Sequence, residues 1–217
     1  MKLKDLFEAP PPEFRDMVRD QSDWIGIVDM GQPGTYISLT TVTRLFKQIG
    51  AVNIQDEQFK ILLHNKGLLA GAYLPSSIKQ NGEAVYAIAC IVYFKSPLIN
   101  TLPDNHHCKI LQIDRVATVP RFESQGLASS VYAALINSGY TVVSDNIQYL
   151  GGKLLWKRIA RESGSYDVHI YDRDNEDYLR DDNGEPIKYD ASNINDDVIW
   201  KKGKPGRRFI LLAKDTT

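Results

Sequence analysis

The sequence predicts a single α/β domain of the α+β kind, with a mixed central sheet of six to seven strands flanked by helices. Residues 84–94 form a nearly continuous apolar run, rich in β-branched and aromatic side chains, that is typical of a strand buried on both faces. Residues 110–119, a helical pattern from Leu127 to a stop at Gly139, and residues 140–145 predict a right-handed βαβ unit. The 217 residues, of which 43% are hydrophobic, are enough for one full core.

Composition excludes several classes of protein. Lysine and arginine total 26 against 27 acids, so the net charge of −1 favours neither nucleic acid nor a membrane surface as a general partner. The sequence has no apolar run of ~20 residues and no signal-peptide core, which predicts a cytoplasmic protein. Two cysteines, Cys90 and Cys108, do not make a disulfide framework. Nothing in the sequence indicates an oligomeric state.

The N-terminal half is expected to supply an arm and the first strands. Residues 1–20 include three successive prolines and are predicted to be an extended arm ahead of a domain over residues 21–217. Further elements are predicted as a strand at 24–28, a helix at 40–49, and a hairpin formed by 59–64 and 67–74.

The C-terminal part changes character after Gly164. We expect a helix over residues 149–159 and strands over 166–171 and 208–213. Between these two strands lies an acidic run that starts at Asp172 and is predicted to be a solvated insertion. It does not match a calcium loop, because Asp177 stands where that pattern requires glycine.

The loop from Thr118 to Ala128 carries the main functional signal. A proline, polar residues and then Gly126-Leu127-Ala128 predict a sharp turn that opens a helix. Unpaired amide N–H groups at a helix start, together with the helix dipole, favour a phosphate or pyrophosphate. A plain strand-to-helix turn is the alternative interpretation of the same pattern.

This loop resembles motif A of the GNAT family of N-acetyltransferases, which reads Val-x-Pro-x-Tyr-Arg-Gly-x-Gly-x-Gly/Ala. Pro120, Gly126 and Ala128 match that pattern, with Thr118 on the valine position and Phe122 on the tyrosine position. The two departures are Glu123, on the arginine position, and Ser124, on the first glycine position.

The following helix is similar to motif B of the same family, Asn-x-x-Ala-x-x-x-Tyr. Tyr149 falls on the asparagine position, Gly152 on alanine and Trp156 on tyrosine. A Ser-Asp pair followed by Gly-Gly and Leu-Trp also resembles family members encoded by bacteriophages. In many members the motif-B tyrosine protonates the departing thiolate, which an indole cannot do. Trp156 can equally be a core aromatic that covers the sheet.

The resemblance implies transfer of an acetyl group from acetyl-coenzyme A to an amine acceptor by direct attack. It assigns residues 110–164 to the coenzyme A half, residues 21–109 to the acceptor half, and residues 165–217 to the last strands with their acidic insertion. The residues it implies for the cofactor are Thr118, Val119, Ser124, Gln125, Gly126, Leu127, Ala128, Tyr149 and Trp156.

The catalytic candidates are an acid on the motif-A strand and two hydroxyls near the next strand end. Asp114 is a candidate general base, acting directly or through water, although pairing with Arg115 or Arg121 explains it as well. Ser144 and Tyr149 are candidates for the general acid. A backbone N–H near Thr118 is expected to polarise the acetyl carbonyl.

Three alternatives are weighed against this function. Glu123 and Trp156 favour a non-catalytic binding module with the same fold. The basic turn at residues 201–208 is the support for a phage enzyme that modifies a nucleic-acid base. A metal site at His106, His107 and Cys108 is disfavoured, because no second Cys or His pair follows at finger spacing.

Overall fold

The computed structural model describes residues 36–80, 82–99, 102–104, 108–145, 150–162, 166–190, 199 and 208–216. The strands in this part of the chain are β1 (Tyr36–Ser38), β2 (Phe46–Ile54), β3 (Glu57–His64), β4 (Leu69–Gln80), β5 (Glu83–Lys95), β6 (Lys109–Thr118), β7 (Tyr140–Val143), β8 (Tyr166–Asp172), β9 (Asp177–Tyr178) and β10 (Phe209–Asp215). The helices are α3 (Leu39–Leu45), a 3-10 turn η3 (Pro120–Phe122), α4 (Leu127–Asn137) and α5 (Leu150–Glu162).

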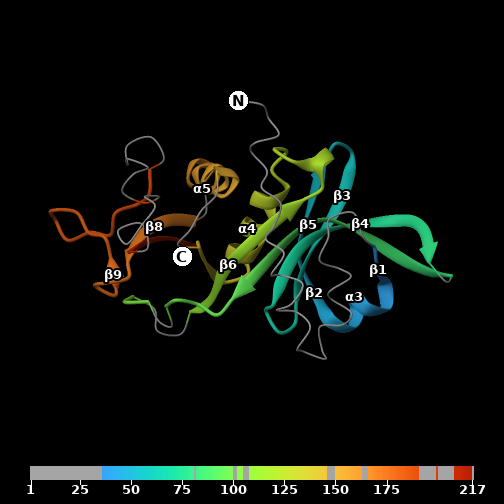
Figure 1. The fold of residues 1–217 in the computed structure, drawn as a ribbon, viewed down its shortest axis with the longest axis horizontal. Helices are drawn as coiled ribbons and strands as arrows, with labels where there is room; N and C mark the ends of the chain where they lie inside the picture. Colours follow the sequence, from blue (N-terminus) through green and yellow to red (C-terminus); the bar gives the residue numbers. More distant parts are fainter. Residues whose placement is uncertain are drawn as a thin grey trace.

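All ten strands belong to one mixed sheet, so the α+β class is confirmed and the predicted number of six to seven strands is wrong. The strand order is β2-β3-β4-β5-β6-β7-β10-β8-β9, and β1 pairs separately with β5 (Figure 1). The additional strands include the three-residue β1 and the two-residue β9. Such short strands carry too few residues for a period to show in the sequence. The expected arm (1–20) and strand (24–28) lie outside the described residues.

The predicted helix over residues 40–49 is only half right. α3 begins after Ser38, whose Oγ accepts a hydrogen bond from the Thr41 backbone N–H at 3.2 Å. The helix ends at Leu45, and Phe46 already pairs with His64 in the antiparallel ladder of β2 and β3. The ladder satisfies the backbone of residues 46–54, and this tertiary pairing outweighs a helical spacing that continues to Ile49.

The hairpin and the buried strand are confirmed. β3, β4 and β5 form an antiparallel meander. Along β5, Cys90 and Val92 pack into the core on the α4 side, whereas Ile91 and Tyr93 pack into the core on the opposite side. A strand with two buried faces has no polar positions, and this explains its continuous apolar sequence.

The expected parallel unit is present. β6 and β7 are parallel neighbours, and α4 connects them. The helix ends at the C-cap residue Ser138, and Gly139 follows with φ of +80°, the left-handed conformation that suits glycine after a helix. The predicted helix at 149–159 is α5, and β10 inserts between β7 and β8.

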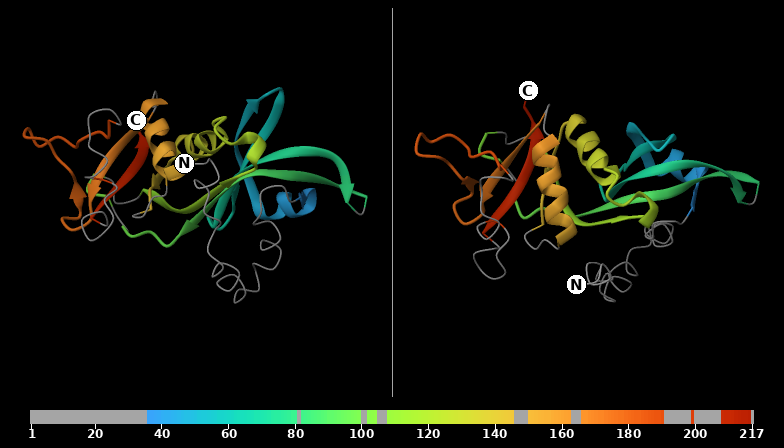
Figure 2. Two further views of the ribbon diagram at one scale, coloured as in Figure 1. Left: turned by 45° about the horizontal axis from the view of Figure 1, so that its top comes forward. Right: turned by 90° about the horizontal axis from the view of Figure 1, so that it is seen from above.

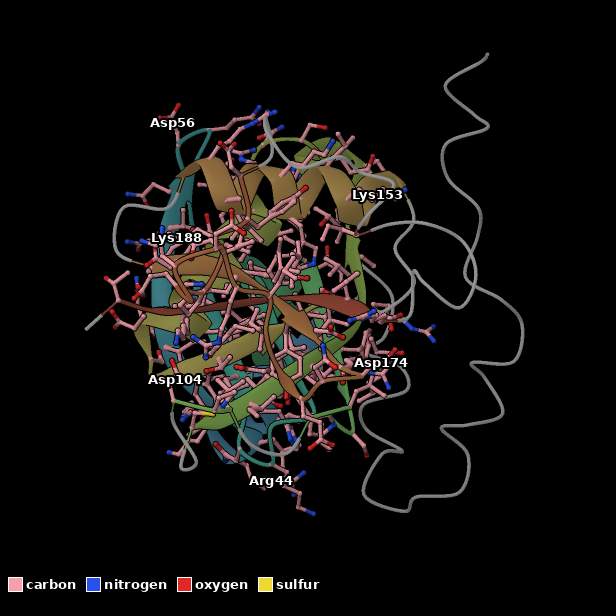
Figure 3. All side chains as sticks on the ribbon, turned by 90° about the vertical axis from the view of Figure 1, so that its left-hand side faces the viewer. Arg44, Asp56, Asp104, Lys153, Asp174 and Lys188 are labelled. Atoms are coloured by element: carbon pink, nitrogen blue, oxygen red, sulfur yellow. The ribbon has the colours of Figure 1, made fainter. Side chains whose placement is uncertain are left out.

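The acidic insertion is mostly exposed, as predicted, and its buried residues between 172 and 182 are Asp172 and Tyr178. Asp172 is only 2% exposed and accepts a hydrogen bond from Arg208 Nε at 2.8 Å. Hydrogen bonding from Arg208 holds the pKa of this carboxyl below its usual value. Asp174, next to this pair, is exposed on the side of the molecule shown in Figure 3.

α4 and α5 cover one face of the sheet (Figure 2). The opposite face carries two separate apolar clusters. One cluster lies under α3 on β3 to β5, and the other lies on β7, β8 and β10. None of the helices in the described part of the chain has the length and apolarity needed to cross a bilayer.

Candidate functional site

β6 and β7 separate into a fork at the carboxyl end of the parallel unit. They pair only from Lys109 opposite Tyr140 to Gln112 opposite Val143. β7 ends there, whereas β6 continues to Thr118. Beyond Gln112, this side of β6 therefore has no strand partner among the described residues. Ligands of open α/β sheets collect at such carboxyl ends.

A buried glutamine closes the base of the fork. Gln112 is fully buried, and its Nε2 donates to the carbonyl of Ser144 at 3.1 Å. Its Oε1 accepts the backbone N–H of Leu98. The side chain thus satisfies backbone groups of the chain on both sides of β6 at the point where the strands part.

The fork exposes backbone donors of β6. The Val119 N–H donates to the Ala89 carbonyl at 2.8 Å. Because successive N–H groups alternate sides in an antiparallel ladder, the Thr118 N–H points away from β5 and toward the fork. The Thr118 hydroxyl is used elsewhere, since it lies 3.4 Å from Cys90 Sγ on the α4 face of the sheet.

The loop that follows β6 has the backbone of an anion cradle. Ser124 and Gly126 both adopt positive φ, +63° and +89°, and Gly126 is the N-cap of α4. Four consecutive amide N–H groups at the helix start find no acceptor among the described residues, namely those of Gly126, Leu127, Ala128 and Ser129. Such donors, at the positive end of a helix dipole, suit a phosphate.

α5 places a cation over this loop. Arg158 Nη1 lies 3.4 Å from the Ser124 carbonyl oxygen. A Cβ built on Gly126 would come within 2.7 Å of Arg158 Nη2, so the guanidinium lies directly against the turn. The carboxylate of Glu123 makes no hydrogen bond or ion pair within the described part of the chain. Arg158 therefore adds one positive charge at the turn whose sequence carries Glu123.

The remaining cofactor candidates occupy two kinds of position. Val119 and Ala128 are half-buried beside the loop, and Leu127 is buried in the core. Gln125 turns back on the loop and donates from Nε2 to the Arg121 carbonyl. Its Oε1 is buried and has no hydrogen-bond partner within the described residues.

The structure describes one of the two motif-B cofactor candidates, and this residue lies in the core. Trp156 is 1% exposed, and its ring packs edge-to-face on Tyr132 with 5.6 Å between centroids. The core interpretation of this tryptophan is therefore confirmed. Tyr149 lies outside the described residues.

The two described catalytic candidates differ in access. Asp114 is the extra residue of a bulge in β6, because Tyr93 pairs with Arg115 and Phe94 with Ile113. Its carboxylate is partly exposed and pairs with Arg115 Nε at 3.2 Å. This agrees with the alternative prediction, in which Asp114 pairs with a neighbouring arginine. Ser144 is fully buried, and its Oγ accepts the Leu211 N–H at 2.9 Å, so this hydroxyl holds β7 to β10.

Sequence reasoning missed one ion pair at the fork. Lys95 Nζ lies 2.6 Å from Asp145 Oδ1, and both side chains are partly buried. Lys95 pairs with Gln112 across β5 and β6, so its ammonium spans the fork base to reach the residue after Ser144. Asp145 is identifiable as polar after a strand, but its partner lies 50 residues away and carries no local signal.

No family model matches this sequence, and a comparison with curated proteins finds no match either. Within the described residues no group of three or more His, Cys, Asp or Glu side chains could hold a metal ion. His106 and His107, as well as residues 201–207 of the basic turn, lie outside those residues. Arg208, the last residue of that turn, is paired with Asp172.

Proposed function

We propose that this protein is an N-acetyltransferase of the GNAT type, which transfers an acetyl group from acetyl-coenzyme A to an amine. The observation that carries the proposal is the fork between β6 and β7 beside a glycine-centred turn with four unpaired amides. A pyrophosphate fits those amides, and a thioester arm passing into the fork would reach the Thr118 N–H.

The chain's own part in the reaction is mostly positioning. Bound coenzyme A supplies an activated acetyl group as its thioester. The acceptor amine forms the new C–N bond as the C–S bond breaks, and the Thr118 N–H stabilises the negative charge that develops on the carbonyl oxygen. The amine must lose a proton, and Asp114 is the described carboxylate on β6 that could take it, directly or through water.

Burial leaves few groups that could act as the general acid. Trp156 is a core residue, and the Ser144 hydroxyl is fully buried against Leu211. Tyr149 or water is therefore left to protonate the departing thiolate. The same observations favour the second candidate function, in which the fold binds coenzyme A or a related nucleotide without catalysis.

A thermal melt with and without excess acetyl-coenzyme A tests the proposed site. A ligand at ~100 times its dissociation constant stabilises the folded state by about 2.7 kcal/mol, which gives a clear rise in Tm. The rise should be lost in Gly126→Ala, because that Cβ would enter the space between the turn and Arg158. Gly184→Ala is the matched control, since Gly184 has a similar φ of +84° with open space around it.

The outcomes separate the two candidate functions. A rise in Tm together with acetyl transfer to a panel of amines supports the enzyme. A rise without transfer to any amine supports the binding module. If the wild-type Tm does not change at millimolar acetyl-coenzyme A, the acetyltransferase and a binding module for coenzyme A both fail.

A further inference from the structure

A second polar cavity lies at the amino end of β6 and β7, at the opposite end of the parallel unit from the fork. It has a volume of about 550 Å³ and is bounded by strand ends, by the loop after α4 and by the end of β10, with Lys109, Lys214, Asp104 and Asp215 as its charged residues. Small-molecule sites typically measure on the order of 300–1,000 Å³, so the cavity is large enough for a ligand. The proposed acetyl transfer does not use it.

Two lysines approach one tyrosine at the edge of this cavity, and one of them, Lys109, belongs to its lining. Lys109 and Tyr140 both line it and are partners in the parallel ladder. Lys109 Nζ lies 5.8 Å from the centre of the Tyr140 ring, and Lys47 Nζ of β2 lies 5.2 Å from the same centre. Two ammonium groups around one ring repel each other, and a cation–π contact alone offsets only part of this repulsion.

Neither lysine is neutralised by a carboxylate within the described residues. Lys47 donates instead to the Tyr140 hydroxyl, at 3.0 Å. The other lysine of the lining, Lys214, differs, because it pairs with Asp104, which also accepts from the Tyr178 hydroxyl at 2.9 Å (Asp104 is labelled in Figure 3). Burial alone would raise the pKa of Asp104, but these hydrogen bonds outweigh it and the pKa is lowered. Asp104 therefore stays ionised and committed to Lys214.

We propose that a small, multiply charged anion of the phosphate class binds at the edge of this cavity, held by Lys109 and Tyr140 of its lining and by Lys47, which contacts Tyr140 from outside the lining. The Tyr140 hydroxyl accepts its hydrogen bond from Lys47, so its own proton remains available to donate to an anion oxygen. Charge-assisted hydrogen bonds from two ammonium groups and one hydroxyl then replace the repulsion between the lysines.

The same chain contains a matched pair that lacks these features. Lys60 Nζ lies 5.4 Å from the centre of the Tyr86 ring and donates to its hydroxyl at 3.0 Å. This pair has the geometry of Lys47 and Tyr140, but Tyr86 does not line the cavity as Tyr140 does, and no second lysine contact with the Tyr86 ring is recorded among the described residues. The Lys60–Tyr86 pair is therefore the control for a lysine–tyrosine contact away from the cavity.

Calorimetric titration of the full-length protein with inorganic pyrophosphate tests the site, with citrate in a parallel titration to distinguish phosphate from carboxylate. Saturating coenzyme A is included to block the loop at Gly126. We expect saturable pyrophosphate binding that weakens about tenfold in Lys47→Gln and in Lys109→Gln and weakens less in Tyr140→Phe. Lys60→Gln should bind as the wild type does. All these side chains except that of Tyr86 are at least partly exposed, so the variants should fold.

Each outcome decides the proposal. No pyrophosphate binding, or equal binding by Lys47→Gln, Lys109→Gln and wild type, overturns it. Tighter binding of citrate overturns the phosphate class. If coenzyme A itself does not bind, the titration is repeated with Arg158→Gln, which removes the cation at the loop. Binding that survives Arg158→Gln and is lost in Lys109→Gln supports the cavity even though the proposed acetyltransferase function has failed.

Discussion

The guanidinium of Arg158 lies against Gly126, in the space that a side chain at position 126 would need. This contact joins two elements that are 32 residues apart, the turn before α4 and the third turn of α5. It brings a guanidinium of α5 to the turn that carries the four amides without an acceptor among the described residues. The anion site proposed at the loop therefore combines backbone donors with a side-chain cation.

Replacing Arg158 by Gln should weaken coenzyme A binding about tenfold, because a charge-assisted hydrogen bond to a phosphate is lost. Binding of pantetheine, which has no phosphate, should be unchanged. Arg161→Gln, in the exposed last turn of the same helix, is the control. Equal loss for pantetheine and coenzyme A in calorimetric titrations would show that Arg158 acts through the fold instead.

Ser124→Gly should stabilise the protein by about 0.5–1 kcal/mol. Ser124 is exposed and has φ of +63°, a conformation that costs a residue with a Cβ more than it costs glycine. Urea unfolding of the two proteins measures the difference. Glu176→Gly, at an exposed position with φ of +52°, should give a gain of the same sign. A loss of stability in Ser124→Gly alone would mean that the serine side chain contributes a native contact.

Gly71→Ala should destabilise the protein by roughly 1–3 kcal/mol or more, because overpacking in a buried strand has no easy relief. The new Cβ would come within 2.5 Å of the Cys90 carbonyl oxygen and 3.0 Å of Tyr73 Cε2. Gly151→Ala, in the first turn of α5 with nothing within 4 Å, should instead raise stability slightly. Equal effects of the two substitutions on the free energy of unfolding would contradict the packing argument.

The Asp172–Arg208 pair should make stability depend on acid pH. The folded-state pKa of Asp172 is lowered by hydrogen bonding from Arg208, so its contribution is complete above the unfolded value of 3.8 and is lost as pH falls through the folded pKa. Asp172→Asn should cost about 1–3 kcal/mol near neutral pH and flatten the profile below pH about 4. Asp177→Asn, at a partly exposed pair with Arg180, should change the profile much less. Urea unfolding at a series of pH values makes the comparison, and parallel profiles for wild type and Asp172→Asn would refute it.

Much of the central unit could be predicted from the sequence. The apolar run of β5, the pattern of α4 and the glycine at 126 each encode a local property: burial on both faces, a helical period, or a positive φ. These properties depend on neighbouring residues, so a linear sequence is sufficient to show them. The turn beside β6 can be predicted for the same reason, because glycine at position 126 favours a positive φ.

The boundary between α3 and β2 was decided by the tertiary structure. The helical spacing continues to Ile49, but pairing with β3 takes over at Phe46. Likewise, the sequence offers Ser144 as a candidate general acid, yet its hydroxyl oxygen is buried and accepts the Leu211 N–H. In each case the deciding partner is distant in sequence and arrives through the order of strands in the sheet.

The sequence by itself thus determined the α+β class, the parallel unit and the turn that offers backbone donors. Only the tertiary structure decided which side chains lie against that turn and which are buried in the core. It set Arg158 over Gly126, Lys95 against Asp145 and Trp156 against Tyr132. The physical reason is that a period or a φ angle is a property of one segment, whereas a contact needs two segments whose meeting depends on the whole sheet.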